Sequence, residues 1–433
     1  MTETATDRAE AIRARLRDRE GTGLRTFATP DPIVWARTSG SRVTDANGRE
    51  YVDLQAGFVV ANVGYCHPRV TEALVRQAGV MTHCPSGSPS ELRADFYDRL
   101  AAITPKGLDR FLPALGGSLA TEIAVNLART VTGRDAVISF SGTYVGRTTG
   151  AVRLAGKREY RRQVRVAGGA HFVPFPDPYR SPWANGDKPA ELALALVEQM
   201  LTDPGSGIDP VACIIVEPIQ GNAGVVIPDE SFLPGLRRLC DRSGALLIFD
   251  EIQSGFGRTG RMWAQEHTNV VPDLMTMGKG LGGGLPIAAV AGREDLMTTW
   301  EPDAVTSTFI ANALTLAAAN AAIDVMRDEG LVERSANLGA DALVRLQTAL
   351  ADSAIVGDVR GRGLFIGIEI VTDRTRHEPD AASAATAAAA LRERGFIIGR
   401  GGRYGNVLKL APPLVISEDE LSEAINAVSE VLE

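Results

Sequence analysis

The segment 245–286 contains two short apolar runs, and each of them leads into an ionisable residue. The run 245–249 is followed directly by Asp250, and the run 274–277 is followed by a glycine and then by Lys279. Short unbroken apolar runs are typical of strands that are buried on both faces. Because α/β proteins bind ligands at the carboxyl ends of parallel strands, the sequence predicts that Asp250 and Lys279 meet in one site.

A carboxylate beside an amine favours a site for pyridoxal phosphate. This cofactor needs a lysine that holds its aldehyde as a Schiff base and an acid that keeps its ring nitrogen protonated. Neither residue is diagnostic alone, since an acid at the end of a strand is commonly a helix cap or part of a solvated turn. The glycines within 255–260 have the spacing of a dinucleotide-binding loop, but no apolar helix opens at them, so a nucleotide site is not predicted.

Composition and charge exclude several classes of function. The net charge of −8, without clusters of basic and aromatic residues, argues against nucleic acid as a partner. No apolar run reaches the roughly 20 residues that span a bilayer, and the charged residues 1–21 predict a solvated helix and no secretory signal. The four cysteines are widely separated, so we expect no metal site, no disulfide framework and a cytoplasmic location.

The order of strand and helix patterns along the chain predicts an α/β fold. Apolar runs at 136–140 and 211–216 alternate with helical patterns at 119–133 and 190–201, which favours a mostly parallel sheet. An Asn47-Gly48 pair predicts a hairpin in a small N-terminal sheet. The C-terminal part is expected to contain long helices at 313–329, 333–351 and 381–394 with strands within 355–370 and 396–412.

The motifs DEIQSGFGRTG, which begins at Asp250, and PDLMTMGKGLGGGLP, which contains Lys279, resemble the signature of the class III aminotransferases. These are pyridoxal phosphate enzymes of fold type I that include 4-aminobutyrate and ornithine aminotransferases, and the resemblance extends from about Pro32 to the C-terminus. It implies a large cofactor-binding domain at 66–312 with a mostly parallel seven-stranded sheet. A small α+β domain would be built from both termini, with residues 1–65 and 313–433.

The resemblance assigns roles around the cofactor ring. Asp250 would pair with the pyridine nitrogen, and Lys279 would form the internal aldimine and act with Asp250 in catalysis. Ile252 would pack on one ring face, Tyr144 would stack on the opposite face, and Gln253 would contact the ring hydroxyl.

Further positions are expected to bind the cofactor phosphate. Gly117 and Ser118 lie where a glycine turn enters a helix, and such a helix start favours anions. By the resemblance, Thr308 would reach the phosphate of the neighbouring subunit, which implies a homodimer with shared sites. Glu217, at the end of the run 211–216, is also expected among the cofactor-binding residues.

Substrate contacts are expected at three positions, two of which depart from the family. Arg147 matches an arginine that grips a substrate carboxylate, and a guanidinium suits that group. Asn222 and Lys409 stand where many relatives have a glutamate and an arginine that pair as a switch between two kinds of substrate. We expect Lys409 to remain available to a carboxylate or phosphate, although it could instead line a solvated channel. Val145 replaces the usual histidine beside Tyr144.

The function implied is transfer of an amino group from a carboxylate-bearing amine or amino acid to a keto acid through an aldimine at Lys279. An alternative within the same family is a racemase or epimerase, or else a decarboxylase or lyase, because the cofactor motifs do not separate these reactions. A binding protein without turnover is the third hypothesis, and it is disfavoured because Asp250, Gln253, Lys279 and Tyr144 are all present.

Overall fold

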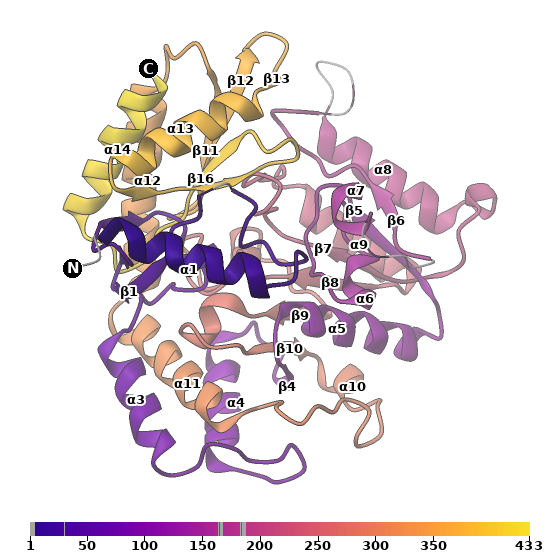
Figure 1. The fold of residues 1–433 in the computed structure, drawn as a ribbon. Helices are drawn as coiled ribbons and strands as arrows, with labels where there is room; N and C mark the ends of the chain where they lie inside the picture. Colours follow the sequence, from indigo (N-terminus) through magenta and orange to yellow (C-terminus); the bar gives the residue numbers. More distant parts are fainter. Residues whose placement is uncertain (1–4, 30, 163, 165–167, 182, 184–187) are drawn as a thin grey trace.

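A sheet of seven strands forms the centre of the computed structural model, which describes residues 5–29, 31–162, 164, 168–181, 183 and 188–433 (Figure 1). The strand order is β4-β10-β9-β8-β7-β5-β6, and every strand is parallel to the others except β10, which is antiparallel to both of its neighbours. The strands are β4 (Arg110–Ala114), β5 (Ala136–Phe140), β6 (His171–Val173), β7 (Val211–Val216), β8 (Leu246–Asp250), β9 (Leu274–Met277) and β10 (Ala288–Gly292). The predicted mostly parallel sheet is confirmed.

Helices cover both faces of this sheet. In β7, Ile214 and Val216 pack toward α8 (Pro189–Thr202) and α9 (Phe232–Ser243), whereas Cys213 and Ile215 pack toward α5 (Gly117–Thr132). Because successive side chains of a strand point to opposite faces, these two clusters lie on opposite sides of the sheet. Burial on both sides explains why the central strands are continuous apolar runs in the sequence.

Segments from both ends of the chain form the second part of the fold. The strands β1 (Trp35–Ser39), β2 (Arg42–Asp45) and β3 (Glu50–Asp53) form a sheet that is extended by the C-terminal strand β14 (Phe396–Ile397). A further sheet contains β11 (Val356–Gly361), β12 (Ile366–Asp373), β13 (Glu378–Pro379), β15 (Gly399–Gly401) and β16 (Val407–Leu410). Helices α12 (Leu331–Ala349), α13 (Ala381–Glu393) and α14 (Glu418–Leu432) complete it. The expected small α+β unit built from both termini is confirmed.

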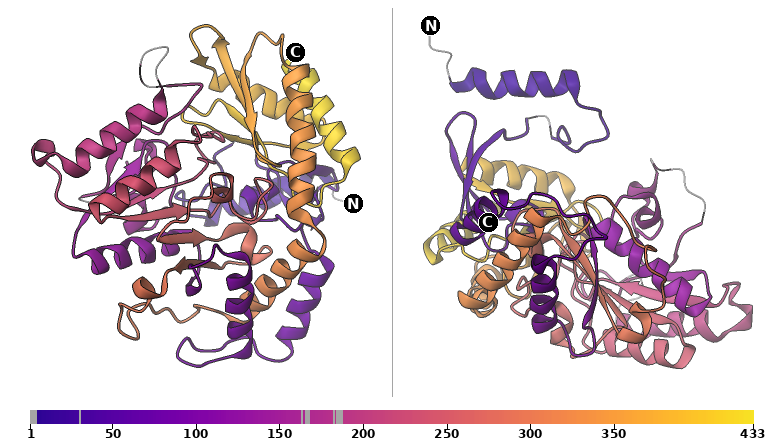
Figure 2. Two further views of the ribbon diagram at one scale, coloured as in Figure 1. Left: turned by 180° about the vertical axis from the view of Figure 1, so that it is seen from behind. Right: turned by 90° about the horizontal axis from the view of Figure 1, so that it is seen from below.

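A third group of helices packs together below the central sheet in Figure 1. Helix α11 (Ala313–Asp328) lies against α3 (Pro68–Ala78) and α4 (Glu91–Ile103). Helix α1 (Ala5–Arg19) lies at the margin of the molecule, as the right-hand view in Figure 2 shows. The short helices are α2 (Ala56–Val59), α6 (Thr149–Val152), α7 (Arg158–Arg161) and α10 (Glu294–Met297), with 3-10 turns at Pro204–Ser206, Ala264–His267 and Lys279–Gly282.

The observed elements agree closely with those expected from the pattern. β5, β7 and β9 have the predicted bounds, and the hairpin between β2 and β3 turns at Gly48, whose φ is 87°. β6 is the shortest strand of the central sheet, and it lies at the edge, where it pairs on one side only. No helix opens at the glycines of 255–260, as expected. Among the described residues, no helix combines the length and the apolar character that a bilayer crossing requires.

Candidate active site

Asp250 is the last residue of β8 and has one unsatisfied carboxylate oxygen. Its Oδ1 accepts hydrogen bonds from the Thr276 hydroxyl (3.2 Å) and the Ile252 amide (3.1 Å). Its Oδ2 is buried and has no hydrogen-bond partner among the described residues. Burial raises the pKa of this carboxyl to about 6. A buried acceptor without a donor is costly, so this oxygen is suited to a ligand that brings an N–H group.

Lys279 lies at the end of the neighbouring strand β9, as the sequence predicted. Burial lowers the pKa of its amine, while the nearby carboxylates Asp250 and Glu217 oppose the shift. Its backbone has a φ of 46°, in the left-handed region that residues with a side chain seldom adopt. The next residue must be small, because a Cβ on Gly280 would lie 2.6 Å from Nδ2 of Asn62. The turn therefore holds Lys279 in an unusual backbone conformation at the carboxyl end of β9.

Glu217 follows β7 and joins two loops at the edge of the site. One of its oxygens accepts hydrogen bonds from the Thr143 hydroxyl (3.0 Å) and the Tyr144 amide (2.9 Å), and the other accepts from the Gly221 amide (3.2 Å). Burial, with a further contribution from Asp250, raises the pKa of Glu217 to about 7. Glu217 thus positions Tyr144 and the loop after β7. Its predicted contact with the cofactor stays a prediction.

The start of helix α5 faces Ile252 across the site. The first amide groups of a helix have no partner within the helix and attract anions. A Cβ on Gly117 would lie 2.8 Å from Cδ1 of Ile252, so only glycine permits this close packing. The Ser118 hydroxyl accepts a hydrogen bond from the Arg147 amide (3.2 Å) and keeps its own proton to donate. Gly117 and Ser118 therefore border an anion site beside Ile252.

The loop after β7 contacts Gln253 through Gly221 and Tyr160 through Asn222. A Cβ on Gly221 would lie 2.5 Å from Oε1 of Gln253, which places that side chain directly against this loop. The Asn222 amide donates a hydrogen bond to the hydroxyl of Tyr160. Tyr160 in turn contacts Tyr144 edge to face, with 5.3 Å between the ring centroids. The guanidinium of Arg147 lies 4.4 Å from the centroid of Tyr160 and forms a cation–π contact.

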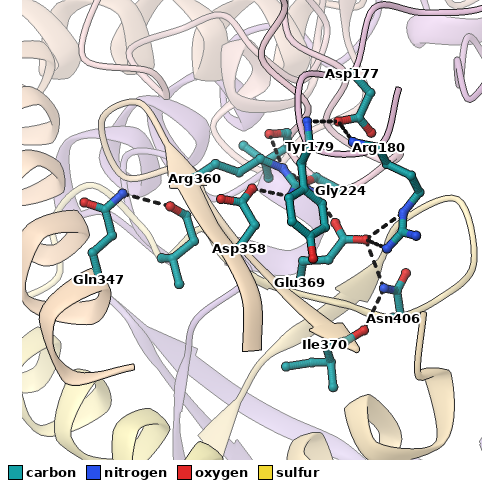
Figure 3. A network of polar contacts seen from close by, with 12 residues as sticks. Asp177, Tyr179, Arg180, Gly224, Gln347, Asp358, Arg360, Glu369, Ile370 and Asn406 are labelled. Carbon is teal, nitrogen blue, oxygen red and sulfur yellow. Dashed lines mark hydrogen bonds and ion pairs between the residues drawn. The ribbon is translucent and has the colours of Figure 1, made fainter. Parts of the chain in front are cut away.

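A polar network fixes the loop that carries Asn222 (Figure 3). Nη2 of Arg360 donates to the carbonyl of Gly224 (2.7 Å) and to Glu369 (2.6 Å), and Nη1 donates to Asp358 (2.8 Å). Glu369 also accepts from Nη2 of Arg180 (2.8 Å). Burial opposes ionisation of Glu369, but these partners together hold its pKa below the usual value. The β11–β12 hairpin is thereby tied to the loop at the active site.

Lys409 lies on β16, beside Asn222. A Cβ on Gly401 would lie 2.9 Å from Cε of Lys409 and 3.1 Å from the Asn222 carbonyl oxygen, so both residues flank this glycine. Burial lowers the pKa of Lys409 to about 8, and the positive charges of Lys279 and Arg25 contribute to the shift. Asn222 thus places a neutral residue next to the Lys409 amine.

The sequence reasoning missed three residues at this edge of the site. Tyr160, Lys157 and Thr143 were not singled out, although Tyr160 contacts Asn222, Thr143 contacts Glu217, and Lys157 lies over the ring of Tyr160. The signal for Tyr160 was an aromatic residue within the mostly basic stretch 157–162, which is also common on a solvated helix. Only the packing of α7 against the loop after β7 distinguishes a tyrosine that belongs to the site from one on a solvated helix.

Two other predicted positions lie away from this cluster. Thr308 is exposed on the turn before α11 and makes no hydrogen bond in the part of the chain that the structure describes. Val145 is 1% exposed and packs in the core next to α5, so an apolar side chain occupies this dry position.

The arrangement around Asp250 fits pyridoxal phosphate. The unsatisfied Oδ2 of Asp250 can accept from a protonated ring nitrogen, and Lys279 supplies an amine one strand away. The start of α5 can take the phosphate, and Ile252 provides an apolar surface between them. Each part of the cofactor thus finds a complementary group.

Comparisons with known proteins agree with this geometry. The model of the family "Aminotransferase class-III" matches residues 26–432. A diaminobutyrate–2-oxoglutarate aminotransferase of Rhizobium meliloti is 35% identical over 96% of this chain and 91% of its own length. An alanine/serine racemase of Pyrococcus horikoshii is 32% identical over 95% of this chain and 87% of its own.

Solved structures include the ornithine aminotransferase of Toxoplasma gondii, described with partial occupancy of PLP at its active site. It is 31% identical, with a TM-score of 0.85, and the match covers 98% of this chain and 94% of that one. The family match, the fold and the chemistry of the site agree, and the chain belongs to the class III aminotransferases, which are pyridoxal-phosphate-dependent enzymes of fold type I.

Proposed function

We propose that this aminotransferase uses Lys279 and Asp250 as its catalytic residues. The observation that carries the proposal is that an Asp250 oxygen without a donor among the described residues and the Lys279 amine lie at the ends of two adjacent strands. Bound pyridoxal phosphate supplies a ring that withdraws electrons from the carbon bearing the amino group. Asp250 would accept a hydrogen bond from the ring nitrogen and favour its protonated form, because that oxygen has no donor among the described residues.

Lys279 acts as the base that moves a proton. Burial lowers its pKa, so more of the amine is neutral near pH 7 than for a solvated lysine. A neutral Nζ removes the proton from the amine-bearing carbon of the donor and later returns one to the acceptor. Glu217 keeps Tyr144 and the loop after β7 in place beside this path.

Substrate recognition rests on the residues around Tyr160. We propose that Arg147 binds a substrate carboxylate, since its guanidinium is held on the Tyr160 ring and is exposed to the site. The acceptor is a keto acid, in line with the 2-oxoglutarate named for the Rhizobium relative. Gln253 is proposed to contact the ring hydroxyl, and Gly117 and Ser118 to bind the phosphate.

The assembly is proposed to be a homodimer in which Thr308 reaches the neighbouring subunit's phosphate site. In support, Thr308 is exposed and its neighbour Phe309 is 59% exposed, which leaves an apolar side chain in need of a partner. Within each subunit we propose the divisions 1–65, 66–312 and 313–433. A reducing cytoplasm is the proposed location and suits the four free cysteines.

Reduction with borohydride tests the role of Lys279. Borohydride fixes a lysine-bound cofactor covalently, and peptide mapping of the holoenzyme then locates the added mass. We expect the mass on Lys279 and none in Lys279→Ala, which should lose turnover by about 10³-fold or more. A mass on Lys409 or Lys157 would contradict the assignment.

A second measurement distinguishes amino transfer from racemisation. The enzyme is incubated with an enantiopure amino acid, with and without a keto acid, and both the amino product and the optical rotation are followed. We expect a new amino acid only when keto acid is present. Loss of optical activity without keto acid would instead favour the reaction named for the Pyrococcus relative.

A further inference from the structure

Five basic residues gather around Asn222 and Tyr160, and we call them the cation cluster: Arg25, Arg147, Lys157, Arg403 and Lys409. The charges of Arg403, Arg147 and Arg25 act on Lys157, and those of Arg25 and Lys157 act on Lys409. In the described part of the chain, none of the five has a carboxylate within 4.0 Å. The cluster therefore lacks counter-charges of its own.

Asn222 stands where an acid could have neutralised the cluster. Its side-chain amide donates to the Tyr160 hydroxyl. Its backbone carbonyl oxygen accepts from the backbone amide of Gly402 (3.1 Å). The carbonyl of Gly402 in turn accepts from Nζ of Lys157 (2.8 Å). Asn222 is thus held beside Lys409 as a neutral residue, and every hydrogen bond that fixes it is made to a neutral group.

Two acids lie near enough to influence the cluster, and neither pairs with it. Both oxygens of Glu217 accept from the residues that it positions, and its burial disfavours the charged form. Glu159 acts on Lys157 but is exposed to solvent. A partly buried cation without an anion is unfavourable, so the missing negative charge is expected from a ligand.

Space for such a group exists next to the cluster. A hollow of about 260 Å³ is lined by Ser141, Gly142, Gly156, Lys157, Arg158, Glu159 and Arg403. Four of these seven residues are charged, and three of the four are basic. Lys157 and Arg403 of the cation cluster thus border a space that can take a small anionic group.

We propose that the cation cluster selects substrates that carry an anionic group at the end remote from the reacting carbon, and that it rejects substrates with an ammonium group there. The proposal rests on the proposed function and narrows it, because the same site then takes dicarboxylic donors and acceptors and excludes diamino acids. Asn222 and Lys409 are the residues that set this preference. The Rhizobium relative, by contrast, is named for a diamino acid.

Binding of ligands of equal length to the holoenzyme tests the proposal, with the cofactor in its pyridoxamine form so that no aldehyde is present to condense with an amine. Glutarate carries two carboxylates, pentanoate carries one, and 1,5-diaminopentane carries two ammonium groups. By calorimetry we expect glutarate to bind at least about tenfold more tightly than pentanoate, the effect of one additional favourable charge contact, and the diamine not to bind. The holoenzyme already contains the cofactor phosphate. The ligands therefore report only on basic residues that the phosphate does not neutralise.

A matched pair of variants isolates the charge at position 222. Asn222→Glu places an acid beside Lys409, whereas Asn222→Gln has the same length and no charge. We expect Asn222→Glu to weaken glutarate binding by at least about tenfold and Asn222→Gln to leave it within about threefold of wild type. Retained cofactor absorbance and thermal unfolding show that both variants are folded.

The possible outcomes separate this inference from the proposed function. Equal binding of glutarate and the diamine, no binding of either ligand, or equal effects of the two variants would overturn the inference. A protein that transfers amino groups but shows one of these results keeps its function and loses the selectivity. Selective glutarate binding without amino transfer from any donor would instead overturn the function and leave the charge preference.

Discussion

Two groups of charged residues lie on either side of the loop that carries Asn222, and they are built differently. In the network of Figure 3, Arg180 and Arg360 share the carboxylate of Glu369, and Asp358 neutralises Arg360 further. The cation cluster has five basic residues and no carboxylate within 4.0 Å among the described residues. Charges that satisfy one another hold a fold together, whereas charges left unsatisfied in a site are available to a ligand.

The largest effect is expected when the paired network is broken. Glu369→Gln keeps the shape of the side chain and leaves Arg180 and Arg360 without their carboxylate. Removing one partner of a buried pair costs about 3–5 kcal/mol, so urea unfolding at pH 7 should show a loss of that order. The pKa of Glu369 is held below its unfolded value, so its contribution is present above that value and is lost as pH falls through the folded pKa. The difference between the two proteins should therefore shrink in acid, and a constant difference would contradict the pairing.

The opposite result is expected in the cation cluster. Lys409→Met removes a cation that has no counter-charge, so urea unfolding at pH 7 should show unchanged stability or a gain of about 1 kcal/mol. Binding of glutarate to the holoenzyme should fall at least about tenfold. Lys409→Arg retains the charge and serves as the control, since it should retain most of the binding. A large loss of stability in Lys409→Met would mean that the lysine is structural.

The pH dependence of ligand binding gives a finer test of the same cluster. The pKa of Lys409 is lowered to about 8 by burial and by Lys279 and Arg25, with Lys157 adding to the shift and Glu217 opposing it. Lys409 is therefore charged below about pH 8 and becomes neutral above it. We expect the affinity for glutarate to fall between pH 7 and pH 9 in wild type, by less than the loss in Lys409→Met. In Lys409→Arg the affinity should change less over this range, and an equal change in both proteins would assign the titration to another group.

The smallest effect is expected at an exposed ion pair. Arg110 on β4 pairs with Glu294 on α10, and their side chains are 54% and 64% exposed. Solvent screens such pairs, so Arg110→Gln should change the free energy of unfolding by no more than about 0.5 kcal/mol. This variant serves as the exposed reference for the buried pair. A loss of stability as large as that of Glu369→Gln would show that burial does not determine how much an ion pair contributes to the free energy of unfolding.

Much of the site could be predicted because its residues follow directly from strands. Asp250 and Lys279 end two apolar runs, and parallel strands necessarily bring their carboxyl ends together. Gly117 and Ser118 were predictable for a similar reason, since a glycine turn and a helix start are local features. In each case local sequence largely determines where the side chain lies, and few contacts with distant residues are needed.

Tyr160 and the Arg360–Glu369 network could not be predicted in this way. Tyr160 gains its role only because Asn222, 62 residues away, donates to its hydroxyl. Arg360 reaches Gly224 across 136 residues. The hydrophobic pattern contains no information about such contacts. Tyr160 lies on the short helix α7, Arg360 and Glu369 lie on β11 and β12, and the approach of these elements to the loop after β7 is set by tertiary packing.

The sequence by itself determined the alternation of strand and helix, the acid and amine at neighbouring strand ends, and the resemblance to the class III aminotransferases. Those features depend on local periodicity and on short motifs. Only the tertiary structure decided that one oxygen of Asp250 finds no donor among the described residues, that Asn222 is held on Tyr160, and that Lys409 lies among cations with no carboxylate within 4.0 Å in the described part of the chain. Burial and the pairing of charges are properties of groups that meet in space, so they are decided when the sheets and loops pack together.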